Sequence, residues 1–128
     1  MRDGVGRSPF TSSHSVEFLV ESPRVVVVTL VGEIDLASVG ELEKQFVRAW
    51  EPAPPAVVVV DTAAVEFFSS PGLNVLLDVR RRADIDGTEF RVTVESSFVR
   101  RVLEVTGMDE YLAVYPSRAD ALADIDLD

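Results

Sequence analysis

The fold is decided by residues 56–73, AVVVVDTAAVEFFSSPGL. The stretch opens on a continuous apolar run, typical of a strand covered on both faces of a parallel sheet. This strand is expected to end at Asp61, and a loop then carries the chain to Ser70. Ser70-Pro71 is expected to begin a helix over residues 71–83. Serine is a preferred cap, and proline at the first helical position loses no hydrogen bond that it needs.

Upstream of this stretch, the pattern predicts a hairpin and a helix. Residues 16–20 and 24–31 are strand-like runs joined by Ser22-Pro23, and Gly32 stops the second. Apolar residues at helical spacing then predict a helix over residues 39–50. Ser38 and Glu41 are expected to form its capping box, and three prolines follow it.

Downstream, the pattern continues to alternate between strand and helix. Residues 89–94 predict a strand, Ser97 is expected to cap a helix that Gly107 ends, and residues 112–114 predict an edge strand. Pro116-Ser117 is expected to open a final helix. The order β-β-α-β-α-β-α-β-α implies an α/β fold, with a mixed β-sheet made of an N-terminal hairpin plus parallel strands, covered by α-helices.

Length and composition indicate one cytoplasmic domain. The chain has 128 residues, of which 47% are hydrophobic and 27% charged, as expected of a soluble globular protein. Residues 1–14 are expected to form a flexible leader, and residues 15–128 a single domain. No apolar run approaches the roughly 20 residues of a membrane-spanning helix, and the leader lacks the apolar core of a secretory signal.

The net charge of −10 argues against nucleic-acid binding, which needs clustered cations to neutralise phosphates. The densest basic clusters, residues 80–82 and 100–101, lie within predicted helices and are interpreted as solvated faces. A protein partner is expected instead of DNA, RNA or a membrane.

Few residues offer catalytic chemistry. The chain has no cysteine, and its one histidine is His14 in the leader. It also lacks a glycine-rich phosphate loop and a zinc-ligand cluster. Glu33 and Asp35 alone suggest acid–base or nucleotide chemistry, and a turn with a helix cap at Asp35 accounts for them too. We therefore expect no catalytic residue, no metal, no cofactor and no enzymatic activity.

Ser70 has two interpretations on local chemistry alone. As a helix cap it would contribute about 1 kcal/mol. A hydroxyl at a helix start is also a favourable phosphoryl acceptor, because a phosphate there meets the positive end of the helix dipole and free N–H groups. The residues themselves leave both interpretations open.

Four motifs in order resemble those of the STAS domain, in its anti-sigma factor antagonist form. They are VGEIDLAS (31–38), VVVVD (57–61), VEFFSSPGL (65–73) and VRRVLEVTGM (99–108), with VYPS (114–117) after them. The resemblance covers nearly everything from residue 16 to residue 122, and four motifs in the right order make it specific.

The resemblance implies a partner-switching protein. In that family the dephosphorylated antagonist binds an anti-sigma factor, which releases a sigma factor. The anti-sigma factor is commonly also a serine kinase that phosphorylates the antagonist, and a phosphatase restores binding. Motif position gives the acceptor role to Ser70, with Ser69 as the alternative. The partner-binding residues expected from the resemblance are Glu33, Asp35, Ser69, Ser70, Gly72, Leu73 and Asn74.

Two positions depart from the family pattern. Ser69 stands where the family usually has an acid. Pro71 replaces a small residue, removes an N–H that could hold a phosphate, and biases Ser70 toward extended geometry. These departures support an alternative function, a STAS module that is not phosphorylated and binds its partner constitutively in a stress-signalling or transport assembly.

Overall fold

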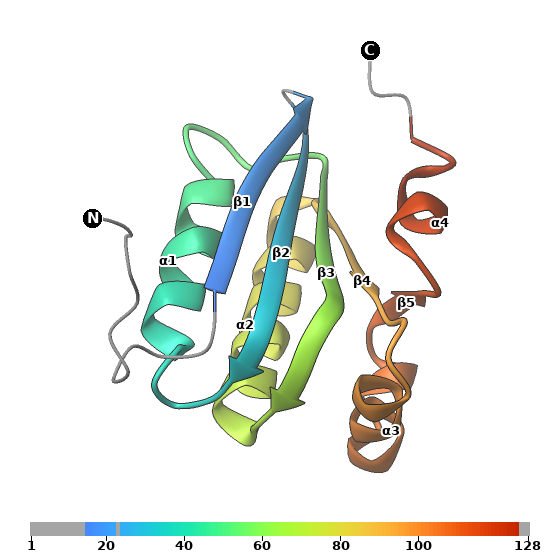
Figure 1. Ribbon diagram of the computed structural model, residues 1–128. Helices are drawn as coiled ribbons and strands as arrows, with labels where there is room; N and C mark the ends of the chain where they lie inside the picture. The colour runs from blue at the N-terminus through green and yellow to red at the C-terminus, as the bar shows by residue number, and fades with distance from the viewer. Residues whose placement is uncertain (1–14, 23, 126–128) are drawn as a thin grey trace, which may run out of the picture.

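Five strands form one mixed sheet in the computed structural model, which describes residues 15–22 and 24–125 (Figure 1). They lie in the order β1-β2-β3-β4-β5, with β1 antiparallel to β2 and all other pairs parallel. Their bounds are Ser15–Ser22 (β1), Val25–Ile34 (β2), Val57–Phe68 (β3), Glu89–Thr93 (β4) and Ala113–Tyr115 (β5). The predicted hairpin followed by parallel strands is confirmed.

The helices alternate with the strands as the sequence predicted. Their bounds are Val39–Ala49 (α1), Ser70–Asp86 (α2), Ser97–Thr106 (α3), Met108–Glu110 (the 3₁₀ helix η1) and Arg118–Leu122 (α4). In Figure 1, α1 and α2 lie side by side against one face of the sheet. Within the described part of the chain, every helix is too short or too polar to span a membrane. The predicted leader, including His14, and the turn residue Pro23 lie outside the described residues.

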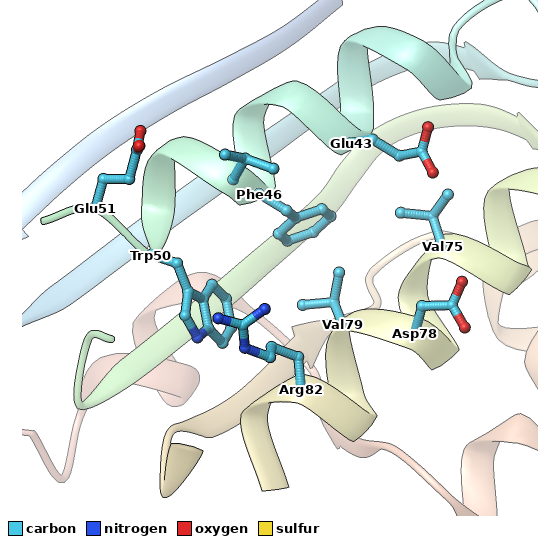
Figure 2. A pocket seen from close by; sticks show the side chains of 9 residues that line it. Glu43, Phe46, Trp50, Glu51, Val75, Asp78, Val79 and Arg82 are labelled. Carbon is cyan, nitrogen blue, oxygen red and sulfur yellow. The ribbon is translucent and has the colours of Figure 1, made fainter. Parts of the chain in front are cut away.

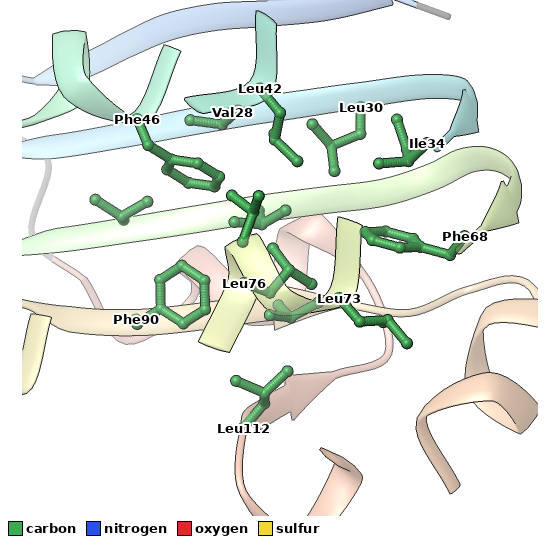
Figure 3. Close-up of a cluster of buried hydrophobic side chains, with 14 of the residues drawn as sticks. Val28, Leu30, Ile34, Leu42, Phe46, Phe68, Leu73, Leu76, Phe90 and Leu112 are labelled. Carbon is green, nitrogen blue, oxygen red and sulfur yellow. The ribbon is translucent and has the colours of Figure 1, made fainter. Parts of the chain in front are cut away.

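The core has a large part on one face of the sheet and a small part on the other. Alternate residues of β2, such as Val28 and Leu30, meet Leu42 of α1 and Leu76 of α2 in the large cluster (Figure 3). Val25 and Val27 of β2 face the other side of the sheet and join the small cluster, together with Ala121 of α4. Burial on both faces explains why β2 and β3 carry continuous apolar runs instead of an alternating pattern.

Both long strands extend beyond the bounds that the sequence predicted. β3 continues past Asp61 to Phe68, because the Asp61 carboxylate has partners that make its burial tolerable. It accepts hydrogen bonds from Thr93 Oγ1 at 3.1 Å and from Arg118 Nε at 3.0 Å. β2 likewise passes through Gly32, whose φ of 84° lies at an irregularity in the β2–β3 register.

The helix caps that the sequence predicted are confirmed at the C-terminal ends of α2 and α3, and several of those predicted at N-terminal ends are wrong. Gly87 and Gly107 adopt positive φ after α2 and α3, as expected of terminating glycines. The predicted capping box of α1 is wrong, because the Ser38 hydroxyl turns back to accept from Asp35 N at 2.9 Å. Ser96, not Ser97, caps α3, whereas Ser117 caps α4 as predicted.

Asp86 ties the end of α1 to the end of α2. Its Oδ2 atom accepts from Arg82 Nε at 2.6 Å and from Trp50 Nε1 at 2.7 Å. The hydrogen bond from Arg82, supported by that from Trp50, holds the pKa of Asp86 below its usual value. The folded protein therefore favours the ionised carboxylate at this position.

This pKa predicts an acid-dependent loss of stability. Because the pKa is lower in the folded chain than in the unfolded chain, the carboxylate stabilises the fold fully above the unfolded value of about 3.9. That contribution is lost as the pH falls through the folded value. Asp86→Asn should therefore lower the free energy of unfolding at neutral pH, and lower it less at an acidic pH below the folded-state pKa. Urea denaturation at both pH values measures the difference, and equal losses at both would contradict the prediction.

Candidate functional site

The carboxyl ends of β2 and β3 lie side by side, and both sequence motifs meet there. Ile34 and Phe68, the last residues of the two strands, are register partners. The connection is continued by Ser69, whose backbone N–H donates to Ile34 O at 2.9 Å. The carboxyl ends of parallel strands are the usual place for binding residues in open α/β sheets.

Ser70 is the first residue of α2 and is exposed. The prediction that Ser70 caps this helix is wrong, since Ser69 occupies the cap position with φ −95° and ψ 172°. No described group forms a hydrogen bond with the Ser70 hydroxyl, and the Ser69 side chain is no exception. The Ser70 hydroxyl is therefore open to solvent.

Pro71 removes one of the two backbone donors that a capping Ser69 side chain could use. A capping side chain accepts from the N–H of the second or third helical residue, and the second here is proline, which has none. The Ser69 hydroxyl instead donates to Ile34 O at 3.3 Å, which fixes the helix start against the end of β2. Ser69 therefore bonds to the scaffold, while Ser70 faces solvent.

Gly72 brings α2 close to the sheet. A Cβ at this position would lie 2.8 Å from Ile34 Cγ2 and 2.8 Å from Phe68 Cε1, closer than real Cβ contacts. Leu73 is buried in the large core cluster. In the free chain both residues position the start of α2, and Asn74, one residue further on, is exposed.

The end of β2 and the loop after it present the acidic residues of the first motif, with Glu33 in the strand and Asp35 in the loop. Glu33 is exposed and Asp35 is partly exposed. The Asp35 carboxylate accepts from Ala37 N at 3.0 Å, and Asp35 N donates to Ser38 Oγ, so the loop holds a defined turn. Asp35 is thus partly engaged in shaping the loop, while Glu33 carries an exposed charge beside Phe67, its register partner.

Three exposed apolar residues lie in the loop after β2, in β3 and in α3, and the sequence reasoning missed them. Leu36 of the loop is 78% exposed, Phe67 of β3 45%, and Phe98 of α3 42%. The rings of Phe67 and Phe98 stack with their centroids 6.3 Å apart. The Phe67-Phe68 pair was the available signal, because two neighbours in a strand face opposite sides and only Phe68 enters the large cluster.

Within the described residues, no group of three or more histidine, cysteine, aspartate or glutamate side chains could hold a metal ion. The arrangement is one of an exposed hydroxyl, exposed carboxylates and exposed aromatic rings. Such a surface is equipped to bind a protein.

The family model described as "STAS domain" matches residues 19–121. The chain belongs to the STAS domain family. The anti-sigma-F factor antagonist RsfB of Mycobacterium tuberculosis H37Rv is 31% identical over 101 residues, which cover 79% of this chain and 81% of RsfB.

Solved structures share this STAS domain fold. An anti-sigma factor antagonist from Mycobacterium paratuberculosis superposes with a TM-score of 0.78 at 29% identity, covering 88% of this chain and 94% of that one. A STAS domain protein from Planctomyces limnophilus superposes with a TM-score of 0.74 at 24% identity, covering 87% and 97% of the two chains. The mixed sheet and helices expected from the resemblance are therefore confirmed.

Proposed function

We propose that this STAS domain is an anti-sigma factor antagonist, and that phosphorylation of Ser70 ends its complex with the anti-sigma factor. The exposed Ser70 hydroxyl at the start of α2 is the observation that carries the proposal. The similarity to RsfB and to the Mycobacterium paratuberculosis protein, both named as such antagonists, supports the choice of partner.

The binding surface in this proposal is the carboxyl edge of β2 and β3. It combines the exposed Glu33, Ser70 and Asn74, the partly exposed Asp35 and Ser69, and the aromatic pair of Phe67 and Phe98. Gly72 and Leu73 contribute by holding the helix start in place. Aromatic side chains are enriched among residues that dominate binding energy at protein interfaces.

Phosphate on Ser70 would oppose binding through charge. A phosphoserine adds about −1.5 to −2 charges at neutral pH. It would stand at the same edge of the sheet as Glu33 of β2 and Asp35 of the loop after β2. A partner covering Ser70 would have to desolvate that dianion. Pro71 also removes one of the backbone donors that could hold the phosphate at the helix start.

The enzymes in the proposed cycle are a serine kinase, which is the anti-sigma factor itself, and a cognate phosphatase, all acting in the cytoplasm. The test is to incubate the full chain with the anti-sigma factor of its source cell and ATP, and to map phosphate by mass spectrometry. Phosphate on Ser70, abolished in Ser70→Ala, is expected. Ser69→Ala serves as the control for the alternative acceptor, and phosphate on neither serine would refute the switch.

The second candidate function is constitutive binding without phosphorylation, as a scaffold or as part of a stress-signalling or transport assembly. Its specific support is the pair of departures at Ser69 and Pro71, both within the segment that a kinase must recognise. A complex that survives incubation with kinase and ATP would favour this function over the switch.

The aromatic pair gives a prediction about affinity. Phe67→Ser combined with Phe98→Ser should weaken binding of the anti-sigma factor about 10- to 100-fold, because truncating central aromatic residues typically costs 2 kcal/mol or more. Isothermal titration calorimetry measures the affinity, and Ile85→Ser, at a residue 79% exposed near the other end of α2, is the matched control. Unchanged affinity in the double variant would remove these rings from the interface.

A further inference from the structure

A groove lies between α1 and α2, away from the start of α2 (Figure 2). Its volume is about 390 Å³, within the range of about 300–1,000 Å³ typical of small-molecule sites. Phe46, Val47, Trp50 and Val79 give it an apolar lining, and the Val47 side chain is 61% exposed. The groove is thus a concave apolar surface that the described parts of the chain leave uncovered.

The charges around this groove favour a cation. Arg82, its only lining cation among the described residues, is neutralised by Asp86 at 2.6 Å. Asp78 is likewise paired with Arg81 at 3.1 Å. Glu43 and Glu51 also line the groove, and neither makes an ion pair with a described residue.

Two carboxylates without an ion pair to the described residues therefore give the groove a negative potential, which the net charge of −10 reinforces. An anionic ligand would be repelled and would find no free cation in the described lining. A second copy of this chain would bring its own net charge of −10 to the same surface, which opposes self-association there.

Trp50 adds a second feature that suits a cation. Its Nε1–H is held by Asp86 at 2.7 Å, which fixes the indole in the wall of the groove. The face of a tryptophan ring attracts ammonium and guanidinium groups within about 6 Å. We infer that the groove binds a small amphipathic organic cation, with its hydrocarbon body on the apolar lining and its amine near one of the two carboxylates, Glu43 or Glu51, which stand at opposite ends of the groove (Figure 2).

Trp50 is also the only tryptophan of the chain, so its fluorescence reports on this groove. The full chain is titrated with 4-phenylbutylamine and, in parallel, with 4-phenylbutyrate, which has a similar body and the opposite charge. A saturable change in Trp50 emission is expected with the amine, at an affinity at least about tenfold higher than for the carboxylate. No saturable response, or equal affinities for both probes, would overturn the proposal.

Variants locate the bound amine. Glu43→Gln combined with Glu51→Gln should lower the amine affinity at least about fivefold, and Val47→Arg should abolish binding by placing a cation on the apolar lining. Glu104→Gln, at an exposed position on α3, is the control and should change nothing. An amine affinity that survives both sets of substitutions would place the probe elsewhere and refute the site.

The leader is the competing occupant, because residues 1–14 carry Arg7 and Phe10. Phe10→Ala should leave Trp50 emission unchanged in the absence of any amine. A shift of Trp50 emission in this variant would identify the leader as the natural occupant and overturn the small-molecule proposal. Since the groove lies outside the proposed partner surface, neither result depends on whether Ser70 is phosphorylated.

Discussion

Ser70→Asp is expected to weaken binding of the anti-sigma factor about 10- to 100-fold, whereas Ser70→Ala should leave the affinity within about twofold. The hydroxyl itself has no described hydrogen bond, so its removal costs the free domain nothing in contacts. An aspartate at the same position would put a permanent charge near Asp35 and in the proposed interface. Like charges brought together at an interface cost several kcal/mol, and a carboxylate carries about half the charge of a phosphate.

The affinity is measured by isothermal titration calorimetry with the anti-sigma factor, at two salt concentrations. Ala119→Asp adds the same charge at an exposed position of α4, so it controls for the change in net charge. Thermal unfolding of each variant checks that the fold is intact. Equal affinities for Ser70→Asp and Ser70→Ala would rule out an electrostatic switch at this residue, even if Ser70 proved to be phosphorylated.

Hydrophobic patterning was enough to predict the order of strands and helices. The continuous apolar runs of β2 and β3 report burial on both faces, and helical spacing is plain in α1 and α3. Pattern failed where tertiary partners override local signals. Asp61 looks like a strand end, and only its contacts with Thr93 and Arg118, far away in sequence, allow β3 to continue.

The sequence predicted only part of the candidate site, because the rest depends on tertiary packing and on the exact helix start. Motif position located Ser70 correctly at the start of a helix, but its role as a cap depended on the exact residue where α2 begins. A shift of one residue moves Pro71 from the first helical position to the second, where it removes one of the two donors that a cap can use. Phe98 joined the site only through packing of α3 near the end of β3, which no local pattern encodes.

Gly72→Ala is expected to lower the free energy of unfolding by about 1–3 kcal/mol, the usual cost of overpacking a filled core. The added methyl would lie 2.8 Å from both Ile34 Cγ2 and Phe68 Cε1, so either side chain or the whole start of α2 would have to move. Because Ser70 lies only two residues before this glycine, the same shift would displace the proposed acceptor. Urea denaturation measures the stability, and kinase treatment of the variant measures the effect on the acceptor.

Gly40→Ala in α1 is the matched control. A Cβ there meets nothing within 4 Å, so this substitution should stabilise the protein by about 0.5–1 kcal/mol through helix propensity alone. A double-mutant cycle with Ile34→Ala then tests the cause, because that change removes the Cγ2 atom that the new methyl would strike. Gly72→Ala should cost at least about 0.5 kcal/mol less in the Ile34→Ala background. If its cost is the same in both backgrounds, contact with Ile34 is not the reason that this helix start requires glycine.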